Sequence, residues 1–382
     1  MSIRLKTILT LLAVAAFAVV LAAQAGAATK KVAVAPGSPV GATPVASSTP
    51  DLTQAAIDAG QKAVGHKPTT EQALKAYWSA DRMEAAITAD DQPGLAAAAS
   101  KQKDNSNADA AHARDAVKKG DKQAPDGPAG KIDGKPASAA SPALAQGQAQ
   151  TFAYQPGYPY YSFPARTAGK VFFTNASNGL NYVCSATIVW SEGRDEVWTA
   201  GHCVHGGAGG TWHYNWVFVP AYSYGWAPYG YWYANQLWTT NGWAGSSDFS
   251  NDMGVAIVGT NWGWHIADYL GGQGIAWNYS KYQYVTSFGY PAEYPFNGQS
   301  LWNCTGGTSP EWTFLWWSAN TLGLNCDMTG GSSGGGWLAW FNGTSGWVNG
   351  HNDYKYDSDP YTMYSPYYGD NAANLFNATR GL

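Results

Sequence analysis

Residues 326–337 read CDMTGGSSGGGW and set two adjacent serines, Ser332 and Ser333, among five glycines. The chain around this stretch is rich in large aromatic residues, with 19 tryptophans and 24 tyrosines. Glycine lets backbone N–H groups approach a ligand where a side chain would crowd them. A Gly/Ser run on its own is more often a plain loop. The stretch therefore indicates a catalytic serine only if other catalytic motifs are present in the chain.

Two other motifs lie upstream of this stretch. TAGHC places His202 just after a strand-like run, and SNDMGVAIV places Asp252 at the head of an apolar run. Acyl transfer by a serine needs an imidazole to take its proton and a carboxylate to fix the imidazole tautomer. Each motif alone is more often structural. Their joint occurrence, in the order His202, Asp252, Ser333, predicts a nucleophilic site.

The part of the chain that carries these motifs has the pattern of an all-β domain. Short β-branched and aromatic runs such as YVCSATIVW, MGVAIVGT and QYVTSFGY alternate with Gly, Asn, Ser and Pro from about residue 151 onward. Such runs between turn residues are typical of a sandwich or a barrel. We therefore predict one all-β domain over residues 151–382.

The N-terminus has the features of an export signal. Two basic residues come first, an apolar run follows over residues 8–23, and small residues near Ala25 or Ala27 offer cleavage sites. The run is short for a membrane span, which favours a cleaved signal peptide over residues 1–27. We therefore expect a secreted, extracellular protein with no stable membrane association.

Residues 28–150 are expected to form a pro-region or leader that is largely helical or disordered. Residues 69–87 hold helix formers throughout, and Thr69 followed by Gln72 fits a capping box. The tracts around them, rich in Ala, Pro, Ser, Lys and Asp, have few large apolar groups to bury.

Charge separates the two parts of the chain. Residues 1–150 carry a net charge of +3 and residues 151–382 a net charge of −7. An acidic, charge-poor domain argues against a nucleic-acid partner, which would need a basic face.

We expect the protein to be a monomer.

The three motifs TAGHC, NDMGVAIV and GGSSGGG resemble the signature blocks of the trypsin/chymotrypsin-like serine peptidases, in the secreted bacterial branch that includes glutamyl endopeptidases. The resemblance covers roughly residues 165–355. It implies a chymotrypsin fold of two six-stranded antiparallel β-barrels. It also implies that His202 is the general base, Asp252 its orienting partner and Ser333 the nucleophile. The backbone N–H groups of Gly331 and Ser333 would form the oxyanion hole.

The same resemblance implies a secreted endopeptidase made as a zymogen, which hydrolyses polypeptide substrates through an acyl-enzyme and uses no metal or organic cofactor. The family pairs cysteines where Cys184 and Cys203 stand, which leaves Cys304 with Cys326. Metal binding is the rival interpretation of these cysteines, but apart from His202, Cys203 and His205 the sequence shows no close Cys/His cluster with the spacing of a zinc finger.

The sequence leaves the cleavage preference open. Asp327 stands six residues before Ser333, where trypsin-type enzymes recognise Lys or Arg, but it could equally be a turn residue. His351 stands where glutamyl endopeptidases carry a histidine that meets an acidic side chain. A preference for bulky apolar residues is the third possibility. Two alternative functions also stay open, namely a non-catalytic binding module on the same scaffold and a carbohydrate- or cell-wall-binding protein.

Overall fold

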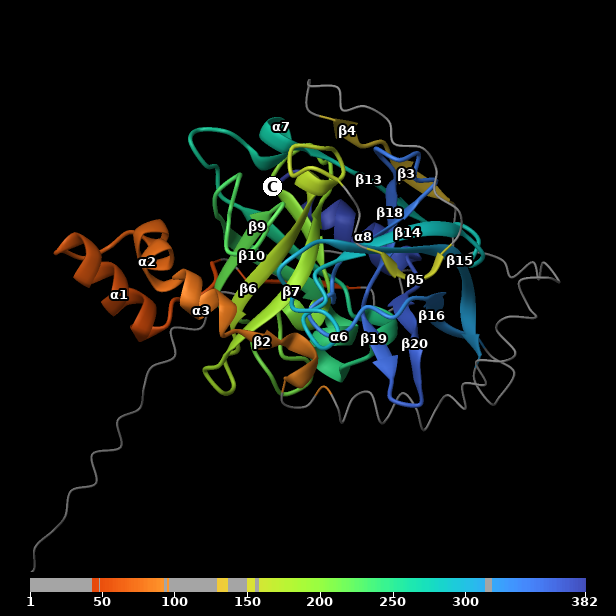
Figure 1. Cartoon of the computed structure of the whole chain (residues 1–382), viewed down its shortest axis with the longest axis horizontal. Coiled ribbons are helices and arrows are strands. Elements are labelled where there is room, and N and C mark those ends of the chain that lie inside the picture. The colour runs from red at the N-terminus through yellow and green to blue at the C-terminus, as the bar shows by residue number, and fades with distance from the viewer. Residues whose placement is uncertain are drawn as a thin grey trace, which may run out of the picture.

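Strands make up most of the regular structure and form two main sheets, with few helices (Figure 1). The computed structural model describes residues 43–47, 49–92, 95, 129–136, 150–154, 158–312 and 318–382. The predicted signal peptide, residues 1–27, lies outside this part of the chain. No helix within the described ranges is long and apolar enough to cross a bilayer.

The first sheet closes on itself as a six-stranded antiparallel barrel. Its strands follow the order β10, β11, β8, β7, β6, β9, and β9 pairs back to β10 through Trp232 and Phe218. This result confirms the predicted antiparallel β-barrel architecture in the first half of the domain. The six strands are β6 (Ala168–Thr174), β7 (Asn181–Ile188), β8 (Glu196–Thr199), β9 (Tyr214–Pro220), β10 (Trp232–Thr240) and β11 (Gly254–Val258).

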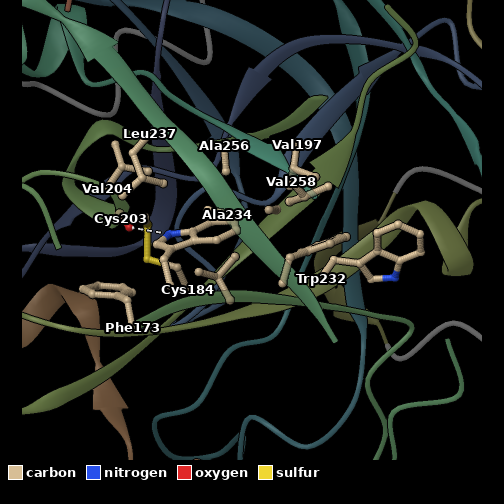
Figure 2. Packing of buried hydrophobic residues seen from close by; sticks show 14 of the residues in the cluster. Phe173, Cys184, Val197, Cys203, Val204, Trp232, Ala234, Leu237, Ala256 and Val258 are labelled. Carbon is tan, nitrogen blue, oxygen red and sulfur yellow. Dashed lines mark hydrogen bonds between the residues drawn. A yellow bond between two sulfur atoms is a disulfide. The ribbon is translucent and has the colours of Figure 1, made fainter. Parts of the chain in front are cut away.

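Alternate residues of these strands point inward and fill the barrel (Figure 2). The disulfide between Cys184 and Cys203 lies inside this core, where both residues are fully buried. The indole N–H of Trp216 donates to the carbonyl oxygen of Cys203 at 3.0 Å. This bond satisfies a buried donor and fixes the backbone next to His202.

The second sheet has β14 at its centre, between β15 and β17. Its strand pairs are antiparallel except for β13 with β18, which run parallel. The disulfide between Cys304 and Cys326 ties β15 to the residue that follows β16. The strands are β13 (Gly274–Trp277), β14 (Tyr284–Gly289), β15 (Trp302–Trp312), β16 (Ser318–Asn325), β17 (Gly336–Ala339), β18 (Trp347–His351), β19 (Tyr354–Tyr356) and β20 (Asp359–Pro366).

A second apolar cluster joins the two sheets. Trp198 of the barrel packs there with Tyr368 and with Phe376 of the C-terminal helix α8 (Asp370–Thr379). Ile275 and Val348 of the second sheet belong to the same cluster. Burial of this apolar area holds the two sheets in one fixed arrangement. Two further short helices are α6 (Asn241–Ser246) and α7 (Ile266–Leu270).

Part of the leader folds as helices against the barrel (Figure 1). The capping box of Thr69 and Gln72 is present at the start of α2, as predicted. Tyr77 and Trp78, at the end of α2, are buried in a cluster that includes Phe172 of β6. The three helices are α1 (Gln54–Val64), α2 (Thr70–Tyr77) and α3 (Ala80–Glu84).

The leader also supplies short strands, which its composition did not indicate. Edge strands offer unpaired N–H and C=O groups to any extended segment that reaches them, so pairing depends on position more than on composition. Of the five strands that lie before the domain or across its expected start at residue 151, β1 pairs with β10, β2 with β7, β3 with β13, β4 with β12 and β5 with β15. Their bounds are β1 (Pro44–Ser47), β2 (Ile87–Thr88), β3 (Gly130–Ile132), β4 (Lys135–Pro136), β5 (Gln150–Tyr154) and, for the partner of β4, β12 (Gly271–Gly272).

The disulfide next to the Ser333 loop is expected to contribute measurably to stability. Replacing both Cys304 and Cys326 by serine releases a cross-link that spans 22 residues. Because the unfolded chain then gains conformational entropy, the free energy of unfolding should fall by about 3 kcal/mol. Urea unfolding followed by tryptophan fluorescence measures the change. An unchanged midpoint and slope would contradict it.

Candidate active site

His202 and Asp252 meet because their strands are neighbours. The pairing of β8 with β11 sets Thr199 opposite Gly254, so the segments just beyond these residues lie at the same end of the barrel. There the Nδ1 atom of His202 lies 2.9 Å from Oδ2 of Asp252. The backbone N–H of His202 donates to the other oxygen of Asp252 at 2.7 Å. Both side chains are buried, so the carboxylate fixes both the ring and the backbone of His202.

Ser333 lies in the loop between β16 and β17, which the barrel holds through Ser185 of β7. The backbone N–H of Ser185 donates to the carbonyl oxygen of Ser333 at 2.7 Å. The hydroxyl of Ser185 donates to the carbonyl oxygen of Gly331 at 2.9 Å. Gly334 has a φ of +83°, and a Cβ atom there would lie 2.0 Å from Oγ1 of Thr199. Only glycine fits that position.

The two adjacent serines are used differently. The hydroxyl of Ser332 donates to the carbonyl oxygen of Thr329 at 2.8 Å, inside the loop. The hydroxyl of Ser333 points away from its own loop and donates to Oδ1 of Asp90, a leader residue, at 3.2 Å. The backbone N–H of Gly331 donates to the other oxygen of Asp90, also at 3.2 Å. A hydroxyl and an N–H group thus converge on one carboxylate in front of Ser333.

Asp353 is a second carboxylate beside His202 that the sequence analysis missed. Its Oδ1 atom lies 3.4 Å from Nδ1 of His202, and its side chain has no exposed area. Its carbonyl oxygen accepts a bond from the Ser333 hydroxyl at 3.4 Å. An aspartate between two short strands, β18 and β19, looks like an ordinary turn residue in the sequence, because only the packing of the two sheets brings it to His202.

The pKa values of Asp353 and His202 both lie above their usual values. Burial raises the pKa of Asp353 well above its usual range, and the neighbouring charge of Asp252 raises it further. Burial opposes the charged form of His202, but the charges and hydrogen bonds of Asp252 and Asp353 outweigh it and hold the pKa of His202 well above normal. Both shifts favour the protonated forms of Asp353 and His202.

The same three side chains are also a possible set of metal donors, since one atom of each lies within 4.8 Å of the others. A nitrogen with two carboxylate oxygens is a set that zinc accepts. A second set, Cys184 and Cys203 with His202, does not fit a metal because both sulfur atoms are in a disulfide. The prediction that the protein uses no metal stays untested.

A cavity of about 500 Å³ adjoins Ser333. Tyr354, Lys355 and Tyr356 line it on one side. The Nζ atom of Lys355 donates to the carbonyl oxygen of Met328 at 3.1 Å, and burial lowers the pKa of this lysine to about 8. Lys355 is the cationic side chain in this lining, and the sequence analysis did not single it out.

The two residues proposed from sequence to recognise the substrate do not line this cavity. A carboxylate oxygen of Asp327 accepts a bond from the backbone N–H of Ala153 in β5 at 2.5 Å. His351 is buried on the far side of the cluster, where its Nδ1 atom lies 3.0 Å from the Tyr368 hydroxyl. Burial lowers the pKa of His351 to about 4, so it is neutral at ordinary pH.

Comparison with solved structures identifies the class of protein. The protease Anisep from Arthrobacter nicotinovorans is 39% identical to the chain, with a TM-score of 0.54, and the match covers 58% of this chain and 98% of that protein. A thermostable serine protease, AL20, from an extremophilic microorganism is 41% identical, with a TM-score of 0.53 and coverage of 56% and 97%. These matches and the strand topology define a chymotrypsin-like fold.

The chain belongs to the bacterial chymotrypsin-like serine proteases. A Glu endopeptidase shares only 16% identity over 60% of this chain and 97% of its own, with a TM-score of 0.49, so it does not bear on the cleavage preference. No protein-family profile and no curated protein matches the chain.

The influence of Asp353 on His202 can be measured directly. Replacing Asp353 by asparagine keeps the shape of the side chain but removes the carboxylate whose hydrogen bond and charge favour the protonated imidazole. The pKa of His202 should therefore fall, which NMR titration of the histidine ring signals in the full chain would detect. His265 pairs with Asp195 elsewhere and serves as the internal control. A His202 pKa that stays in place would show that Asp353 carries no charge influence.

Proposed function

We propose that this protein is a secreted serine endopeptidase that cleaves peptide bonds through an acyl-enzyme intermediate. Ser333 is the nucleophile, His202 the general base, and Asp252 the carboxylate that fixes the imidazole tautomer. The N–H groups of Gly331 and Ser333 stabilise the oxyanion that forms during attack. The chain is made as a pre-pro-protein, with a signal peptide over residues 1–27 and a leader up to about residue 150.

One observation carries this proposal above the others. The Nδ1 atom of His202 is occupied by Asp252 at 2.9 Å, while its Nε2 atom has no hydrogen-bond partner among the described residues. Because Nδ1 is taken by the carboxylate, Nε2 is the nitrogen that can accept the serine proton once the imidazole has lost its own. The hydroxyl of Ser333 and the N–H of Gly331 both bind the Asp90 carboxylate, on which the charge of His202 also acts. These are the parts that acyl transfer needs.

The proposal predicts that reactivity resides on one of the two adjacent serines. Ser333→Ala should lower kcat by about a millionfold, and His202→Ala by a similar factor. Ser332→Ala is the matched control. It removes a hydroxyl one residue away that bonds only within the loop, and it should retain most of the activity. Hydrolysis of a protein substrate by active, purified protein, with mass mapping of a fluorophosphonate adduct, measures both effects. An adduct on Ser332 would contradict the assignment.

We propose further that the cavity next to Ser333 receives the side chain that precedes the cleaved bond. Lys355 gives this cavity a cation that can meet an acidic side chain, whereas Glu293 and Asp357 also line it and can meet a basic one. Because the ammonium of Lys355 is partly desolvated, its interaction with a carboxylate would be stronger than at the surface.

A substitution series separates Lys355 from the two candidates chosen from sequence. Lys355→Met should lower kcat/KM for substrates with glutamate before the cleaved bond by about tenfold relative to those with leucine. Asp327→Asn should leave this ratio unchanged, because its carboxylate faces β5. Peptide pairs that differ only at this residue provide the measurement. A ratio that moves with Asp327 and not with Lys355 would overturn the assignment of the cavity.

A further inference from the structure

The leader is anchored to the barrel just before it reaches the site. The indole N–H of Trp78 donates to the carbonyl oxygen of Asn215 at 2.8 Å, and the Tyr77 hydroxyl donates to Oδ1 of Asn181 at 2.9 Å. Trp78 is 3% exposed. From there the chain runs through α3 into β2, which pairs in parallel with β7 through Thr88 and Val183. Strand β7 also carries Ser185, which holds the Ser333 loop.

The next residues enter the site itself. Ala89 is fully buried in the barrel core, and Asp90 follows it with its carboxylate on Ser333 and Gly331. On the far side, the Gln92 side chain donates to the carbonyl oxygen of His202 at 2.9 Å. The leader is therefore fixed on both sides of Asp90.

The carboxylate of Asp90 binds the nucleophile assigned here and one of the two N–H groups assigned to the oxyanion hole. Its two oxygens accept from the Ser333 hydroxyl at 3.2 Å and from the Gly331 N–H at 3.2 Å. Burial raises the pKa of Asp90, while the charge of His202 and the bonds from Gly331 and Ser333 oppose this shift. The Gly331 N–H would stabilise negative charge on a reacting peptide, and the Ser333 hydroxyl would attack that peptide, so a carboxylate bound to both competes with substrate.

The leader at Asp90 does not have the shape of an extended substrate. Residues 89–91 form one turn of 3₁₀-helix, closed by a bond from the N–H of Gln92 to the carbonyl oxygen of Ala89 at 3.1 Å. A peptide substrate instead docks as an extended strand along the enzyme. Asp90 thus fills the donors with a side chain, and the atom facing Ser333 belongs to no peptide bond.

We infer that residues 87–92 are a built-in inhibitor that blocks Ser333 by placing the Asp90 carboxylate on the Gly331 N–H and the Ser333 hydroxyl. This inference rests on the proposed function, since it concerns the same serine. The surface that accepts the inhibitor includes Tyr182 and Val183 of β7, the Ser333 loop and the backbone of His202. Activation then requires that the leader leave this surface.

The rate at which a fluorophosphonate modifies Ser333 in the intact full-length chain tests the inference. Asp90→Ala removes the carboxylate and should raise this rate at least about tenfold, because two hydrogen bonds to a charged group are lost. Asp91→Ala is the matched control, since it removes the same charge from an exposed neighbour that bonds only to Thr88. Its labelling rate should equal that of the unmodified chain. Mass spectrometry confirms that each chain is uncut.

A second variant tests the docking of the leader through Trp78 and leaves the Asp90 carboxylate unchanged. Trp78→Ala weakens the docking of the leader without touching Ser333, so it should also speed labelling.

Equal and measurable labelling rates for the unmodified chain and Asp90→Ala would overturn the inhibitor and leave the proposed nucleophile intact. No adduct on Ser333 in any of the chains would overturn the proposed function as well, so the two failures are distinguishable.

Discussion

Close packing of the loop at residues 330–336 between the two sheets is the constraint on which the rest of the site depends. The barrel holds it through Ser185, and the second sheet holds it where the N–H of Gly334 donates to the carbonyl oxygen of Asn352 at 2.7 Å. A Cβ atom on Gly335 would lie 2.0 Å from the carbonyl oxygen of Phe288. Because the loop has no spare volume, the direction of the Ser333 hydroxyl follows from how the sheets meet.

The electrostatics of His202 depend on the same meeting of the sheets. Asp252 comes from the barrel and Asp353 from the segment after β18, so one carboxylate reaches the imidazole from each half of the domain. Two buried carboxylates beside one imidazole repel each other unless a proton lies between them. The apolar cluster around Trp198 therefore does more than stabilise the fold, since it also keeps both carboxylates beside the imidazole.

The sequence predicted what local pattern can encode. The all-β class, the helix start at Thr69 and the meeting of His202 with Asp252 follow from periodicity, capping and motif order. Asp353, Lys355 and Asp90 carried no such signal, because their importance arises only when distant segments pack together. His351 shows the opposite case, in which a motif position suggests a role in substrate recognition that the packing does not support. It lies near the site along β18, but its side chain points into the protein, where the Tyr368 hydroxyl binds it.

The leader shows why donors that favour catalysis also need protection. An oxyanion site works because its N–H groups are oriented before the reaction begins. The same preorganisation makes it bind a carboxylate that reaches it without a large entropic cost, and Trp78 holds Asp90 only twelve residues away. Stronger N–H donors would bind both the transition state and the Asp90 carboxylate more tightly. Release from inhibition therefore cannot come from tuning Ser333 or Gly331, and must come from cutting or displacing the leader.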